Sequence, residues 1–203
     1  MSSSNSTTTE DEHDDEKIAN YIEIPMLREL VARAESDTSN FDDGNATLAA
    51  AQGILGHYFP VDKGYSVTVR DSGHTEVMNA LLTTIQVRYY APSKPGFHLL
   101  IVGDVQMNEN VIDEEDHQRL LKTIEKMEER SFLPWGIFLC GPEITFYDFY
   151  HSEGGDKIML RPDYSPSRPS RYQFHLRHDA EAVDELLRDI TKRAMILIEE
   201  SMR

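Results

Sequence analysis

The chain has 203 residues, enough for one domain with a sizeable buried core. Its 36 acidic side chains against 20 Lys and Arg give a formal net charge of −16, which argues against non-specific attraction of the whole surface to nucleic acid or to an anionic membrane. The single cysteine excludes an intramolecular disulfide. With neither a secretory signal nor an apolar run of membrane-spanning length, we expect an intracellular protein of the cytoplasm or nucleus that makes no contact with a membrane.

Residues 1–17 are expected to form a disordered acidic tail. They begin with Ser, Thr and Asn and continue with an acidic run from Glu10 to Glu16, and no apolar residue follows Met1 before Ile18. Such a segment buries too little apolar surface to offset the entropy of ordering it. Two interpretations remain open, a solvating tail or a segment that docks on a basic protein partner. Residues 18–203 are then expected to form a single domain.

From residue 25 onward the pattern is first helical and then extended. Apolar residues at helical spacing predict helices over 25–34 and 46–58, and alternating or continuous apolar runs predict strands over 65–70, 81–90 and 97–102. A helix is predicted over 114–130, followed by strands over 135–140 and 143–150 that Gly141-Pro142 joins as a hairpin. Residues 157–160 suit a further short strand, and a last helix begins near residue 179. The helix between strands implies an α/β or α+β domain, with a mixed central sheet of about five strands flanked by helices.

The third predicted strand carries the most informative chemistry. Residues 97–102 are apolar apart from His98, and Asp104 and Gln106 follow within four residues. Because side chains alternate along a strand, Asp104 and Gln106 fall on one side. This strand, with helices and two strands before it and a helix and a strand after it, resembles the PD-(D/E)XK restriction-endonuclease-like superfamily. The resemblance covers about residues 46–150 and is one of arrangement more than of residues.

The resemblance implies a candidate nuclease site that holds Mg²⁺. In that superfamily a strand ends in an acidic residue, any residue and Lys, a second acid lies on the preceding strand, and both acids bind a divalent cation that activates water. Asp104 matches the acidic position, Gln106 stands where Lys is expected, and some members use Gln there. Asp71 is the candidate for the second acid and metal ligand, and Glu35 for an assisting helical acid.

The same residues also support a non-catalytic interpretation. The Pro-Asp pair of the superfamily is absent ahead of the strand, and Lys is absent from the position of Gln106. Asp104 is then an ordinary carboxylate at a strand end, and the domain acts in protein–protein contacts through its acidic surface or tail. This degenerate, nuclease-like domain is the favoured hypothesis, and an active Mg²⁺-dependent nuclease that cleaves DNA or RNA is the alternative.

One segment reverses the acidic character of the chain. Residues 161–178 contain a single acid, Asp163, against four arginines that are interleaved with aromatic residues: Arg161, Arg168, Arg171 and Arg177. Arginine with aromatic side chains can bind phosphates and stack on bases, so nucleic acid would bind only through this local basic loop. Alternatively, the arginines pair with acids of the same chain.

Overall fold

The computed structural model describes residues 19–36, 44–71, 83–90, 97–106, 118, 120–122, 135–153, 158–163 and 171–201. The predicted tail over residues 1–17 and most of the predicted helix over 114–130 lie outside these ranges. So do the side chains of Asp71, Asp104 and Gln106, although the strands that carry them are described.

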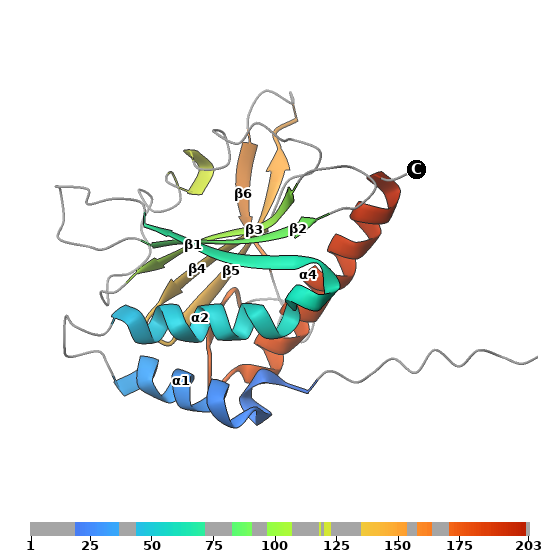
Figure 1. Ribbon diagram of the computed structural model, residues 1–203. Helices are drawn as coiled ribbons and strands as arrows, with labels where there is room; N and C mark the ends of the chain where they lie inside the picture. The colour runs from blue at the N-terminus through green and yellow to red at the C-terminus, as the bar shows by residue number, and fades with distance from the viewer. Residues whose placement is uncertain are drawn as a thin grey trace, which may run out of the picture.

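The centre of the fold is a seven-stranded sheet, which confirms the predicted mixed α/β architecture, including the short strand predicted over residues 157–160, and adds one strand, β7, that was not predicted (Figure 1). The strands are β1 (Tyr65–Asp71), β2 (Thr83–Tyr90), β3 (Phe97–Gln106), β4 (Trp135–Cys140), β5 (Glu143–His151), β6 (Ile158–Pro162) and β7 (Gln173–His175). They lie in the order β1-β2-β3-β4-β5-β6, and β7 pairs with the start of β5. Only the β3–β4 pair is parallel among these described strands. This parallel pair is where the chain crosses from the first half of the sheet to the second.

Three helices lie on one side of the sheet: α1 (Pro25–Ser36), α2 (Gly44–Tyr58) and α4 (Ala180–Ser201). Of these, α2 lies next to the strands, and α1 packs against α2 on the side away from the sheet. Short 3-10 turns, η1 (Tyr21–Glu23) and η2 (Val61–Lys63), precede α1 and β1. The largest core cluster joins apolar residues of these helices to the sheet residues Ile85, Val87 and Ile101. The apolar faces of the amphipathic helices α1 and α4, together with the more uniformly apolar α2, therefore pack into one common core.

The opposite face has a second, smaller apolar cluster. It contains Val102 of β3, Phe138 of β4, Tyr147 and Phe149 of β5, and Leu120 from the helical residues 120–122. Leu100, Ile101 and Val102 are completely buried, which confirms that β3 is a central strand covered on both faces. No helix within the described ranges is both long enough and apolar enough to cross a bilayer.

Gly103 of β3 lies directly against Ile137 of β4, just before Asp104. A Cβ atom built on Gly103 would lie 2.2 Å from Ile137 Cγ1 and 2.8 Å from the Ile137 carbonyl oxygen. These distances leave no room for a side chain, because one of the two obstacles is backbone. Gly103 therefore fixes the spacing of the parallel pair at the point where the predicted site begins.

Candidate functional site

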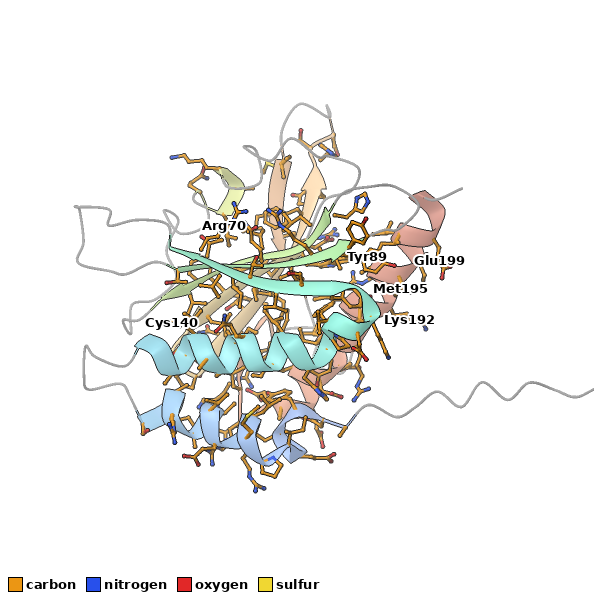
Figure 2. The ribbon with its side chains drawn as sticks, in the orientation of Figure 1. Arg70, Tyr89, Cys140, Lys192, Met195 and Glu199 are labelled. Atoms are coloured by element: carbon orange, nitrogen blue, oxygen red, sulfur yellow. The ribbon has the colours of Figure 1, made fainter. Side chains whose placement is uncertain are left out.

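Asp104 and Gln106 lie at the C-terminal end of β3, at the edge of the sheet that the resemblance implies. The backbone register pairs Asp104 with Thr84 on β2 and Phe138 on β4, and it pairs Gln106 with Cys140. Figure 2 places Arg70 and Cys140 at this end of the sheet, opposite the end that carries Tyr89.

Asp71 lies at the same end of the sheet but in a different row, a row being the set of residues that pair directly across neighbouring strands. It is the last residue of β1 and pairs with Thr83, which in turn pairs with Val105. The rows of Asp71 and Asp104 are therefore neighbours, and neighbouring rows of a regular pleat belong to opposite faces of a sheet. A cation shared by the two acids would require a local departure from that pleat, so the ligand pair stays a prediction.

The β1 position in the row of Asp104 belongs to Arg70. Arg70 pairs with Thr84, and Thr84 pairs with Asp104, so the three residues occupy one row across three strands. Arg70 is exposed and Thr84 is buried. A guanidinium in this row cannot replace a second carboxylate, because Mg²⁺ takes oxygen ligands.

The arginines of the predicted basic loop are engaged with acids of the same chain wherever the structure describes them. Arg161 pairs with Asp148 across β5 and β6. Arg177 binds the Glu35 carboxylate at the end of α1 through both its Nε and its Nη2, at 2.8 and 2.7 Å. Arg168 lies outside the described residues. The intramolecular pairing that the sequence left open is thus observed for three of the four arginines.

Arg171 forms the most buried of these pairs. Its guanidinium donates to Asp179 at 2.9 Å, and its Nε donates to the Gln173 carbonyl at 2.7 Å. Asp179 is only 5% exposed and also accepts the backbone N–H of His175 at 2.9 Å. Arg171 therefore neutralises a buried carboxylate immediately before α4.

Glu35 also lies beside two histidines, a grouping that the sequence analysis did not identify. Ligand-type atoms of Glu35, His175 and His178 lie within 4.8 Å of one another, and the two imidazole rings have centroids 4.3 Å apart. The signal in the sequence is the His-x-x-His spacing at 175 and 178. Its acidic partner at residue 35 is 140 positions away from His175, so the spacing alone cannot reveal it.

The hydrogen bonds of His175 decide what this cluster can do. Its Nδ1 accepts the backbone N–H groups of Arg177 at 3.1 Å and His178 at 3.4 Å, so Nδ1 carries no proton. A neutral ring then carries its proton on Nε2, which lies 3.8 Å from the Glu35 carboxylate. A metal ion on Nε2 would have to displace that proton, while Arg177 already holds both carboxylate oxygens. The cluster is suited to clamping α1 onto the turn before α4 rather than to metal binding.

A further exposed surface lies on the C-terminal half of α4. Met195 and Ile196 are 39% and 48% exposed, and Lys192 and Glu199 on either side of them are exposed as well. Figure 2 shows Lys192, Met195 and Glu199 along this half of the helix, at the end of the sheet that carries Tyr89. The exposure of Met195 favours a partner surface over core filling.

The sequence matches no family model, no curated protein and no solved structure.

Proposed function

We propose that this chain is a non-catalytic, nuclease-like domain that acts through protein–protein contacts. The observation that carries the proposal is the internal pairing of Arg161, Arg171 and Arg177. A nucleic-acid surface needs guanidinium groups that are free to replace counterions on phosphates. The described arginines of the basic loop already have carboxylate partners, in a protein whose net charge is −16.

The exposed apolar side chains support the second half of the proposal. Methionine and aromatic residues are enriched at protein interfaces. Here, besides Met195 and Ile196, the exposed set includes Tyr150, Met159 and Tyr172. The acidic remainder of the surface suits protein partners with basic patches, and it would repel a polyanion.

The end of β3 supports the absence of catalysis. Gln106 replaces the expected lysine, and the β1 position in the row of Asp104 is Arg70 rather than an acid. A nuclease site of this type needs two carboxylates on one cation. The alternative, an active nuclease with Mg²⁺ bound by Asp104 and Asp71, depends on the local departure from the pleat described above.

A cleavage assay tests the catalytic half of the proposal. Single- and double-stranded DNA and RNA are incubated with the full chain and Mg²⁺ or Mn²⁺, with Asp104→Ala as the matched control. We expect equal background from both proteins. Metal-dependent cleavage by the wild-type chain that Asp104→Ala abolishes would overturn the proposal in favour of the nuclease.

Site-specific photo-crosslinking tests the contact half. A photoreactive amino acid is placed at Ile196 on α4, and the control places it at Glu29 on α1, whose side chain is also exposed. We expect protein adducts from position 196 in cells and none above background from position 29. Equal, background-level labelling at both positions would count against a protein-binding role for this face.

A further inference from the structure

Four residues on the C-terminal half of α4 form one stripe, defined here as the α4 stripe: Lys192, Met195, Ile196 and Glu199. Their spacing of three, four and seven residues places them on the same side of an α-helix. Ala194 and Ile198, on the opposite side, are buried in the main core. The buried side fixes the helix to the domain, so the stripe is presented on a rigid element.

The stripe is also held at its centre by the sheet. The Tyr65 hydroxyl lies 3.0 Å from the Met195 sulfur, and the Tyr65 ring packs against Tyr89 with centroids 5.2 Å apart. Met195 is thus partly ordered although it is 39% exposed. Ordering in the free protein reduces the entropy lost when a partner covers the side chain.

The charges of the stripe differ from those of the two arginines of α4. Arg188 pairs with Asp184, and Arg193 pairs with Asp163 and Asp189. Among the residues that the structure describes, neither Lys192 nor Glu199 forms an ion pair. Two opposite charges, without an ion-pair partner among the described residues, therefore stand at the two ends of an exposed apolar pair.

We propose that the α4 stripe binds a second copy of this chain, with the two α4 helices antiparallel. This inference rests on the proposed protein-binding function and names the partner. A two-fold axis that passes between Met195 and Ile196 places Lys192 of each copy opposite Glu199 of the other. Lys192 lies three residues before Met195, and Glu199 lies three residues after Ile196, so the two charges are equally far from the axis. A two-fold interface must be complementary to itself, and the order of charges in this stripe meets that condition.

The association is weak and sensitive to salt. A standard interface buries about 800 Å² on each partner, which is more than two exposed apolar side chains and two charged ones provide. Each copy also carries a net charge of −16, so the remaining surfaces repel one another. Screening by moderate salt should therefore strengthen association, until screening of the Lys192–Glu199 pairs offsets the gain.

Charge reversal at the two ends of the stripe tests the proposal. Sedimentation velocity over a concentration series, with the full chain, should show a monomer–dimer equilibrium for the wild type. Lys192→Glu and Glu199→Lys alone each put like charges opposite one another twice, so each should weaken dimerisation on the order of tenfold. The double variant Lys192→Glu/Glu199→Lys restores complementarity, and so does an equimolar mixture of the two single variants. Both should regain wild-type association.

The design separates specific pairing from general charge. Lys192→Glu makes the chain more acidic and Glu199→Lys makes it less acidic, so a net-charge effect would move the two variants in opposite directions. Glu29→Lys on α1 is the matched control and should not reproduce the loss at Glu199. Circular dichroism and thermal unfolding confirm that each variant is folded.

The outcomes distinguish the partner from the function. A wild-type chain that stays monomeric at every concentration, or single variants that associate like the wild type, would overturn the second copy as partner. If position 196 still crosslinks to a different protein in that case, the proposed protein-binding function stands. If it crosslinks to nothing, both inferences fail.

Discussion

Arg171 neutralises Asp179 at the start of α4, where the carboxylate is 5% exposed and also accepts the His175 amide. Removing the guanidinium by Arg171→Gln leaves a buried charge without its cation. We expect a loss of about 2 kcal/mol in the free energy of unfolding, below the full cost of breaking a buried pair because Arg171 itself is half-exposed. Urea denaturation monitored by circular dichroism measures the loss.

Arg161→Gln is the matched comparison for Arg171→Gln. Arg161 also pairs with an acid, Asp148, but it lies in solvent, and its pair should contribute less than about 0.5 kcal/mol. Equal losses for the two variants would contradict the assignment of Arg171 as a structural residue. A loss of nucleic-acid binding in Arg171→Gln at full stability would contradict it as well.

The strands and helices followed from the sequence because each buries a long apolar pattern. β3 is a continuous apolar run and lies at the centre of the sheet, and α4 keeps its helical period over most of its length. β7 has only three residues, of which Phe174 alone is buried, so no period could reveal it. The sequence did not predict β7 because this strand is too short to show a period, not because its residue propensities were misjudged.

The candidate site was only partly accessible to sequence reasoning. That Asp104 and Gln106 follow an apolar strand is a local property, and the register confirms the strand. The β1 position in that row is Arg70 rather than an acid, and this follows from which residues of β1 and β2 pair. Pairing register is a tertiary property that a single sequence specifies only through the fold, and the same holds for the carboxylate partners of the arginines.

Gly103→Ala should destabilise the fold strongly. The added methyl group would lie 2.2 Å from Ile137 Cγ1 and 2.8 Å from the Ile137 carbonyl oxygen, so the β3–β4 pair must separate. Overpacking of this kind costs about 2 kcal/mol or more. This overpacking should lower the midpoint of thermal unfolding, whether or not the neighbouring Asp104 belongs to a catalytic site. Differential scanning calorimetry measures the shift.

Gly56→Ala in α2 is the opposite case and controls for the change of glycine to alanine. A Cβ at Gly56 meets no atom within 4 Å, and α2 is a regular helix there. Alanine has the higher helix propensity and restricts the unfolded chain, so the variant should gain about 0.5–1 kcal/mol. If both glycine variants lost stability equally, the close approach at Gly103 would not be the cause.

Alkaline pH should destabilise the protein through its buried phenols. Burial, together with a hydrogen bond to Asp184, raises the pKa of Tyr58 above its ordinary value of 10.0, and burial raises the pKa of Tyr65 to about 12. Burial also raises the pKa of Tyr21 and that of Tyr147 above 10.0. These phenols stay protonated in the folded state, while those of the unfolded chain ionise near pH 10. Their stabilising contribution is therefore complete below pH 10 and is lost as the pH rises through the folded-state pKa values.

Tyr58→Phe isolates one of these phenols. A proton that is bound in the folded state but released in the unfolded state lowers the free energy of unfolding by about 1.4 kcal/mol per pH unit. Without the Tyr58 hydroxyl, the variant should therefore lose stability less steeply above pH 10. At neutral pH it should be less stable by about 1 kcal/mol, because Asp184 loses a hydrogen bond. Urea titrations at several pH values between 7 and 11 give both quantities. Parallel pH profiles for the two proteins would exclude Tyr58 as a source of the alkaline slope.

Zn²⁺ and Ni²⁺ should leave the protein unchanged, although Glu35, His175 and His178 have the chemistry of a metal site. The Nδ1 of His175 accepts two backbone amides, and its Nε2 proton faces a carboxylate that Arg177 already binds. A bound ion would have to remove that proton and share Glu35 with a guanidinium, both at a cost in free energy. Thermal unfolding with excess metal should therefore give the same midpoint for the wild type, for His178→Ala and for either protein with chelator. A saturable rise in the wild-type midpoint that His178→Ala abolishes would instead assign a metal to the cluster, and the orientation of His175 would then have to change on binding.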